Sequence, residues 1–279
     1  MLKKILNNEE FLIEKTTFNL IFLIIDSEKL EYYTDGENYL ICRSSEETPI
    51  WIWNKDSICK TKIEEVVNKL QLLLDEDNVF QITSKKEIFE ILRNKYKDLL
   101  VKDYFIQKGD HLHMLAYKCL NPVLTREKVG HRERPTEDDI ETIMYFNRCD
   151  IEESITNKYY QYLNEEQLYN AAKKHISSPT FYVWKVDGRI VATAGYNEGE
   201  KECRIGMVFT SREHRCKGYA GMIVYELCQE ILVKGKTPML YADYDYLPSN
   251  RSYQKIGFEP TGDLYNIKLG KGKMKELKR

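Results

Sequence analysis

Residues 215–220 read Arg-Cys-Lys-Gly-Tyr-Ala, and the expected architecture of the chain follows from their surroundings. They come after a strand-like segment that ends at Thr210 and before an amphipathic helical pattern that runs to about Lys234, with Gly235 as the expected C-terminal cap. A strand, a short loop, a glycine and a helix start form a geometry that can bind phosphate. Successive backbone N–H groups point at the anion, and the helix N-terminus adds about half a positive charge.

Small and basic residues around this loop suit an anionic ligand. Gly218 lets the backbone approach closely, while Ala220 and Gly221 let the helix lie near the ligand. Charge for a further phosphate is available from three side chains: Arg212, Arg215 and Lys217. Taken alone, the pattern R-x-x-G-x-A also fits an ordinary strand-to-helix turn with solvated basic residues.

A second block follows about thirty residues later. Residues 239–243 are expected to form a strand, and residues 249–258 read Ser-Asn-Arg-Ser-Tyr-Gln-Lys-Ile-Gly-Phe. Ser249 is the expected N-cap of a short helix, and Gly257 is expected to end it.

The two blocks, in this order and at this spacing, resemble the GNAT family of acetyl-CoA-dependent N-acetyltransferases. The resemblance covers residues 127–270 and is densest at 204–262. It implies an α/β (α+β) fold with a mixed, mostly antiparallel sheet flanked by helices, and acetyl-CoA as co-substrate.

The resemblance also implies roles for individual residues. The strand residues expected to pair with the pantetheine arm are Val208, Phe209 and Thr210. The residues whose amides are expected to hold the pyrophosphate are Arg215, Cys216, Lys217, Gly218, Tyr219 and Ala220. Asn250 is expected to lie close to the pantetheine arm, and Tyr253 to protonate the departing CoA thiolate.

The chemistry of acyl transfer is compatible with these roles. A phenol with a pKa of about 10 can donate a proton to a thiolate with a pKa of about 8.5 if the site assists modestly. Backbone donors near Val208 can stabilise the oxyanion that forms when an amine attacks the thioester. The alternative for Tyr253 is a core aromatic of the short helix, one of twenty tyrosines in the chain.

The general base is an open question. Many members of the family have a glutamate eleven residues before the phosphate loop, where this sequence has Arg204. An arginine cannot deprotonate an ammonium group. Glu202 on the same strand face is therefore the candidate base, water is an alternative relay, and Arg204 is a candidate for gripping a carboxylate of the substrate. A surface arginine in a cross-strand pair remains a further interpretation.

Neither the cysteines nor the histidines indicate a metal site. The seven cysteines contain no CxxC pair and no His–Cys cluster with zinc spacing, so reduced thiols are expected. His111 and His113 alternate on one strand face without a third ligand nearby, which favours two partly exposed histidines. Cys216 is a conceivable nucleophile, because thiols near helix N-termini are activated. Direct transfer is favoured because Cys216 occupies a variable position of the loop.

The chain is expected to contain two domains, residues 1–124 and 125–279. In the first, residues 20–25 and 39–43 are predicted strands around a turn at Asp35–Gly36, and residues 62–74 and 84–96 are predicted helices. Ser84 and Glu87 form a capping-box pattern. This strand–turn–strand resembles the predicted hairpin at Asp187–Gly188, so the first domain is a candidate degenerate copy of the second. Its role stays open between a substrate-site wall, a partner-binding module and a stabilising domain.

The charged run 126–134 lies between the two domains. It is interpreted as a solvated linker rather than a phosphate-binding arm, because acids and bases alternate in it. Thr136 is then the expected N-cap of a helix, with further helices near 140–149 and 164–175.

Global properties limit the functional classes. A formal charge of −2 gives no field for gripping nucleic acid or an acidic membrane, and no apolar run approaches the length of a membrane span. We therefore expect a cytoplasmic N-acetyltransferase that acts on a primary amine of a small molecule, amino acid or peptide. A CoA-binding regulatory protein with little or no catalysis is the alternative, because of Arg204.

Overall fold

The computed structural model describes residues 1–45, 48–73, 80–100, 110–153 and 164–270. The chain divides into two compact units, Met1–Leu115 with Thr261–Arg279, and Ala116–Pro260. It passes from one unit to the other within β5 (His111–Lys118) and again within β11 (Glu259–Leu269). Independent folding of residues 1–124 and 125–279 stays a prediction.

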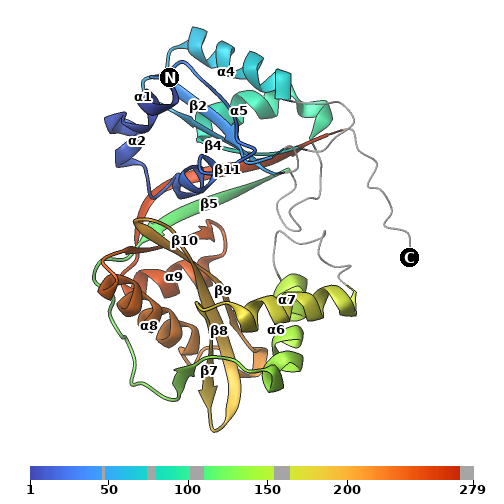
Figure 1. Ribbon diagram of the computed structural model, residues 1–279, viewed down its shortest axis with the longest axis vertical. Coiled ribbons are helices and arrows are strands. Elements are labelled where there is room, and N and C mark those ends of the chain that lie inside the picture. Colours follow the sequence, from blue (N-terminus) through green and yellow to red (C-terminus); the bar gives the residue numbers. More distant parts are fainter. Residues whose placement is uncertain (46–47, 74–79, 101–109, 154–163, 271–279) are drawn as a thin grey trace. The chain divides into compact units, whose positions relative to one another are not determined.

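The first unit is built on five strands in the order β1-β2-β3-β4-β11 (Figure 1). Its strands before the chain crosses over are β1 (Glu31–Thr34), β2 (Tyr39–Arg43), β3 (Ile50–Asn54) and β4 (Phe80–Ser84). Its helices are α1 (Leu2–Leu6), α2 (Glu9–Ile13), α3 (Asn19–Ile24), α4 (Lys60–Leu73) and α5 (Lys86–Lys95), with a 3₁₀ turn at Lys97–Leu99. Only the β3–β4 pair is parallel among these neighbours.

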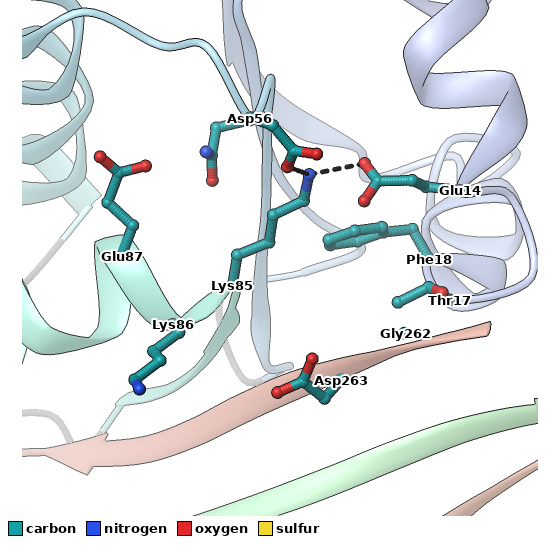
Figure 2. Close-up of a pocket in the computed structure, with 10 residues that line it drawn as sticks. Glu14, Thr17, Phe18, Asp56, Lys85, Lys86, Glu87, Gly262 and Asp263 are labelled. Carbon is teal, nitrogen blue, oxygen red and sulfur yellow. Dashed lines mark hydrogen bonds and ion pairs between the residues drawn. The ribbon is translucent and has the colours of Figure 1, made fainter. Parts of the chain in front are cut away.

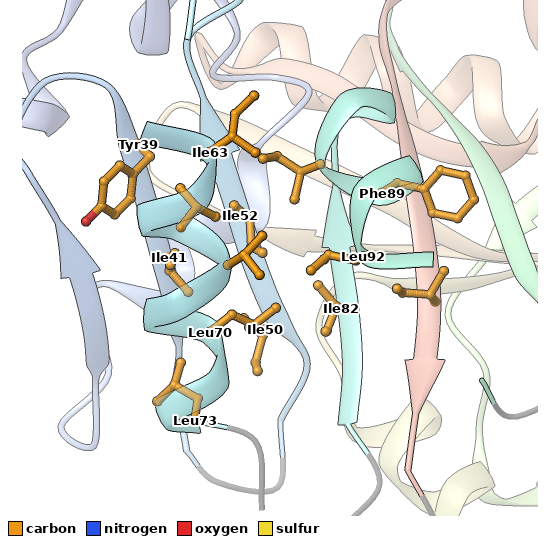
Figure 3. Packing of buried hydrophobic residues seen from close by; sticks show 14 of the residues in the cluster. Tyr39, Ile41, Ile50, Ile52, Ile63, Leu70, Leu73, Ile82, Phe89 and Leu92 are labelled. Atoms are coloured by element: carbon orange, nitrogen blue, oxygen red, sulfur yellow. The ribbon is translucent and has the colours of Figure 1, made fainter. Parts of the chain in front are cut away.

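Strand β3 explains why this unit has apolar packing on both faces of its sheet. All five of its residues are buried. Ile50 and Ile52 pack into a cluster with the apolar faces of α4 and α5 (Figure 3). The alternate residue Trp53 packs edge-on against Phe11 of α2, with 5.2 Å between the ring centroids. Because successive side chains of a strand point to opposite faces, β3 contributes apolar residues to the packing on both faces of the sheet.

Two predictions for this unit are wrong. Residues 20–24 lie in α3 and Ile25 is its C-cap, so this segment is no strand; Ile21 and Ile24 are buried at helical spacing while Leu23 is 43% exposed. Ser84 is no helix cap: it is the last residue of β4 and pairs with Ile52. Helix α5 follows with Lys85 as its N-cap and no side-chain cap hydrogen bond.

The second unit has its strands in the order β10-β9-β8-β7-β6. They are β6 (His131–Glu133), β7 (Phe181–Val186), β8 (Arg189–Glu198), β9 (Glu202–Thr210) and β10 (Thr237–Asp243). The helices are α6 (Ile140–Glu153), α7 (Glu165–Ser177), α8 (Tyr219–Val233) and α9 (Leu247–Ile256), with 3₁₀ turns at Glu137–Asp139 and Arg212–His214. Figure 1 shows α8 and α9 on one side of β7–β9 and α6 and α7 on the other. The mixed, mostly antiparallel sheet flanked by helices is confirmed.

The turns of this unit follow the sequence closely. Asp187 and Gly188 both have positive φ and join β7 to β8 as expected. Thr136 caps the turn before α6 in a capping box with Asp139. The expected cap Ser249 is wrong, because α9 already begins at Leu247 and the Ser249 hydroxyl donates to the Tyr246 carbonyl.

The two units repeat one order of elements. An antiparallel meander (β1-β2-β3 or β7-β8-β9) leads through a helix (α4 or α8) to a parallel strand (β4 or β10) and a second helix (α5 or α9). This shared order supports the interpretation of the first unit as a diverged copy. Within the part of the chain that the structure describes, no helix has the length and apolarity to cross a membrane.

Candidate functional site

A β-bulge interrupts strand β9 just before the residues expected to meet the pantetheine arm. Phe209 pairs with Thr193 of β8 and Gly206 pairs with Gly195, so Met207 and Val208 together oppose one residue. Met207 has φ +54, and its carbonyl accepts a hydrogen bond from the Thr193 hydroxyl at 3.2 Å. Bulges of this kind bend a strand and redirect its backbone groups.

Strand β9 is paired with its parallel neighbour β10 only near the start of both strands. Glu202, Cys203 and Arg204 pair with Thr237, Pro238 and Met239. Beyond these pairs β9 continues to Thr210 and β10 to Asp243. Beyond Arg204 no described strand pairs with the outer edge of β9, so an extended ligand can bind the backbone around Val208 and Phe209 through main-chain hydrogen bonds, while the Thr210 carbonyl already accepts from Arg215.

The loop between β9 and α8 has the backbone conformation that an anion site needs. Cys216 has φ +62, and Gly218 has φ +89 and is the N-cap of α8. Left-handed residues in a turn aim successive amides at one point. Helix α8 has no side-chain cap, so its first amides remain available for an anion.

Arg126 from the charged run lies on this loop. Its Nη1 donates to the Cys216 carbonyl at 2.9 Å. A Cβ at Gly218 would stand 3.0 Å from Arg126 Cδ, so the glycine also makes room for this contact. The linker interpretation of residues 126–134 is therefore incomplete, since one of its arginines adds positive charge at the loop.

The family comparison covers this region of the chain. The model of the acetyltransferase (GNAT) family matches residues 146–258, which include the bulge, the loop and α9. Residues 146–258 belong to the GNAT family. No curated protein matches the sequence.

Solved structures share the fold of the GNAT domain and of the first unit as well. A GCN5-related N-acetyltransferase from Kribbella flavida is 11% identical, covers 96% of this chain and 98% of its own, and has a TM-score of 0.57. An acetyltransferase of the GNAT family from Colwellia psychrerythraea is 10% identical, covers 92% and 97%, and has a TM-score of 0.56. At such identities the likeness concerns the fold.

Glu153 connects helix α6 of the GNAT domain to the loop before α8. Its carboxylate bonds Arg212 Nε at 2.6 Å and also bonds Arg215 Nη2. Burial alone raises the pKa of Glu153, but the two guanidinium groups lower it below its ordinary value. Arg215 further donates to the Thr210 carbonyl at 3.1 Å. These contacts hold both arginines beside the loop.

Tyr253 is half-buried on α9, and its ring packs edge-on against Phe258 at 5.7 Å. Burial, followed by the charges of Asp150 and Tyr246, raises its pKa to about 12. Asp150 itself has its pKa raised to about 6, first by burial and then by Glu153. An acid and a base with separated pKa values thus act on each other electrostatically.

Asn250 is 5% exposed, and its side-chain amide is hydrogen-bonded to other groups of the protein. Its Nδ2 donates to the carbonyls of Asp243, Tyr244 and Tyr246, and its Oδ1 accepts from the Tyr117 hydroxyl at 3.1 Å. This residue fixes the connection between β10 and α9. Its expected proximity to the pantetheine arm stays a prediction.

The two residues considered for proton transfer and substrate binding lie at the start of β9. Glu202 is buried, with 6% exposure. Arg204 is half-buried, burial lowers its pKa, and its Nε has no hydrogen-bond partner among the described residues. At about 3.3 Å per residue, Glu202 is about 20 Å along the strand from Val208.

Three residues of the site were not predicted from the sequence. Arg126 and Glu153 contact the loop from 90 and 62 positions away in the chain, and Asp150 lies with Glu153 on the acid-rich helix α6. In the residues that the structure describes, no cluster of His, Cys, Asp or Glu could hold a metal ion. Cys216 is exposed, and its backbone carbonyl accepts the hydrogen bond from Arg126.

Proposed function

We propose that the GNAT domain transfers an acetyl group from acetyl-CoA to a primary amine of a small molecule, amino acid or peptide by direct attack. The observation that carries this proposal is the loop with left-handed Cys216 and Gly218 at the uncapped start of α8, beside strands that pair only at Glu202–Arg204. A pyrophosphate fits such a loop, and an extended pantetheine arm fits the free edge of β9.

Positive side chains suit the negative charges of the co-substrate. Arg215, Lys217 and Arg126 would surround the phosphates, and the amides of residues 215–220 would hold the pyrophosphate. Val208, Phe209 and Thr210 would pair with the pantetheine arm. Acetyl-CoA would supply the acetyl thioester, and the domain supplies position and proton transfer.

The reaction needs one proton removed and one delivered. The amine nitrogen bonds to the acetyl carbon, the carbon–sulfur bond breaks, and Tyr253 gives its proton to the sulfur. Because Glu202 lies about 20 Å along β9 from Val208, we add Asp150, whose charge acts on Tyr253, as a second candidate base beside Glu202. Burial is the first cause of the raised pKa of Tyr253, and the charge of Asp150 adds to it; a proton taken up by Asp150 would remove that second contribution, so base and acid would work in sequence.

Arg204 is proposed to bind an anionic group of the acceptor, since a guanidinium matches a carboxylate in a bidentate manner. Its Nε, which has no hydrogen-bond partner among the described residues, supports this role. The same residue is what favours the alternative, a CoA-binding regulatory protein with little or no catalysis.

A two-stage experiment tests these proposals. Thermal unfolding is measured with increasing acetyl-CoA, where ligand at a thousand times its Kd should add about 4 kcal/mol of stability. No shift at millimolar acetyl-CoA would rule out both functions. Thiol release is then followed with a panel of amines with and without a carboxylate. Turnover supports the transferase, whereas binding without turnover across the panel supports the regulatory protein.

A further inference from the structure

The first unit contains a pocket at the place in its fold that corresponds to the candidate site of the GNAT domain. The cavity of about 370 Å³ is bounded by the ends of β3 and β4, the start of α5, the segment after α2, and β11 (Figure 2). Ligands of α/β folds bind characteristically beyond the carboxyl ends of parallel strands. The volume is at the lower end of the range for small-molecule sites.

A buried acceptor atom in the pocket wall lacks a donor. Asn54, the last residue of β3, is 1% exposed. Its Nδ2 donates to the Lys55 carbonyl at 3.0 Å, and this bond fixes the orientation of the amide. Its Oδ1 is buried and has no hydrogen-bond partner among the described residues. The missing partner must therefore bring an N–H or O–H group.

The charge of the lining favours a cation. Four carboxylates, from Glu14, Asp56, Glu87 and Asp263, face two ammonium groups, from Lys85 and Lys86. Lys85 Nζ is already paired at 2.7 Å with Glu14 and at 2.7 Å with Asp56. The dashed lines in Figure 2 mark this bridge, with Asp263 on the neighbouring strand. A bound anion would meet an excess of negative charge.

The remaining wall is apolar and closely packed. Phe18 is fully buried and presents its ring to the pocket beside Thr17 (Figure 2). Gly262 of β11 is placed so close to Thr17 that an added Cβ would stand 2.7 Å from its hydroxyl oxygen. An aliphatic chain fits against this wall.

We propose that the pocket of the first unit binds a small aliphatic amine, whose ammonium group donates to Asn54 Oδ1 and is balanced by Asp263 and the other carboxylates. The proposal is independent of acetyl transfer, because no residue assigned to the reaction lines this pocket. It gives the first unit a ligand of its own.

Calorimetric titration of the full chain without acetyl-CoA tests the site. The probes share a four-carbon chain and differ in charge: 1,4-diaminobutane, 1,4-butanediol and succinate. We expect binding of the diamine alone, weakened by added salt. Equal binding of all three probes, or no binding of the diamine at millimolar concentration, would overturn the proposal.

Three variants locate the bound diamine. Asn54→Leu removes the acceptor at similar volume, and Asp263→Asn removes one charge from a half-exposed side chain whose other contact is with His113 Nε2 at 2.8 Å. Each should raise the Kd about tenfold or more, the loss expected for a hydrogen bond to a charged group. Glu64→Gln, on the exposed face of α4, changes charge by the same amount and should leave the Kd unaltered.

If Asn54→Leu does not fold, the Kd of the diamine for Asp263→Asn alone tests the location of the site. A folded variant that binds the diamine as tightly as the unmodified chain would place the ligand elsewhere and refute the site. The absence of acetyl-CoA keeps this outcome separate from any failure of the transferase.

Discussion

The strand–helix–strand segments β3-α4-β4 and β9-α8-β10 have the same topology but differ at the ends of their parallel strands. In the first unit, β3 pairs with the last residues of β4, Ile82 to Ser84. In the GNAT domain, β9 pairs with the first residues of β10, Thr237 to Met239, and a bulge at Met207 follows. In the first unit the second strand, β4, is thus paired to its last residue, whereas in the GNAT domain both strands continue well beyond their last pair.

The loops that follow β3 and β9 also differ in their backbone conformation. None of the described residues between β3 and α4 has a positive φ, whereas Cys216 and Gly218 both do before α8. Without left-handed residues the first loop does not gather its amides around an anion. The shared topology therefore leaves the two loops with different backbone conformations, and only the loop before α8 combines a nearby bulge, a left-handed glycine and a basic neighbour among the described residues. The first unit instead has a pocket whose lining contains four carboxylates and two ammonium groups.

The largest expected effect comes from truncating the chain before the part of β11 that belongs to the first unit. A chain that ends at Pro260 lacks the part of β11 that pairs with β4, including Ile267 and Leu269, each 1% exposed in the core of the first unit. Loss of two such residues costs several kcal/mol, which approaches the whole stability of a domain of about 5–15 kcal/mol. We expect the first unit to lose protection in amide hydrogen exchange.

The control deletes residues 271–279 and keeps all of β11. Protection of the first unit in the shorter chain would show that β11 is dispensable to it. In that case residues 1–124 would stand as an independent domain, as the sequence alone suggested.

The next largest effect compares tyrosines of the helices that follow β10 and β4. Tyr253→Phe removes the proposed proton donor and should lower kcat about 10²–10⁴-fold while the Kd of acetyl-CoA stays constant. Tyr96→Phe, at the end of α5, removes a buried hydroxyl with no hydrogen-bond partner among the described residues and should leave kcat unchanged. Steady-state thiol release measures both. Equal kcat for Tyr253→Phe and the unmodified enzyme would refute the acid role.

Most of the GNAT domain could be predicted because its signals are local. The hairpin at Asp187–Gly188, the loop glycine Gly218 and the cap Gly257 each depend on the φ that their own residue adopts. The strand prediction for residues 20–25 was wrong because their structure depends on tertiary packing and not on a local signal. A short apolar run fits a buried strand and a buried helix equally well, and only the tertiary packing of Ile21 and Ile24 selects the helix.

The site could be predicted only where its residues are close in sequence. The loop at residues 215–220 and Tyr253 stand in recognisable sequence blocks, so the pattern proposes them as site residues; their roles stay predictions. Arg126 and Glu153 reach the loop from distant elements, and Asp150 became a candidate only through its burial beside Tyr253. Charge runs carry no information about which of their members fold back onto a site.

The next, smaller effect is a pH-dependent change in the free energy of unfolding that depends on Asp150. The unfolded chain ionises this carboxyl near pH 4, whereas the folded GNAT domain holds the proton until about pH 6. The folded state therefore loses stability as pH rises from about 4 to 6. Asp150→Asn removes this loss and should stabilise the protein by up to about 3 kcal/mol above pH 6, with no gain at pH 4. Urea unfolding across this pH range measures it.

The control for Asp150 is Glu141→Gln on the exposed face of the same helix, which should show no such pH-dependent gain. If Asp150 is also the catalytic base, Asp150→Asn lowers kcat despite the higher stability. A variant that is less stable than the unmodified protein at pH 7 would contradict the assigned burial of this carboxyl.

The smallest effect distinguishes the two ends of α8. Gly218 and Gly235 both have positive φ, +89 and +71, and each should lose about 1–2 kcal/mol of stability on replacement by alanine. Gly218→Ala also places a methyl group 3.0 Å from Arg126 Cδ and disturbs the amides of the loop. It should raise the Kd of acetyl-CoA about tenfold, whereas Gly235→Ala, with open space around its Cβ, should leave the Kd unaltered. If both variants bind acetyl-CoA equally well, the loop before α8 is no more a phosphate site than its counterpart before α4.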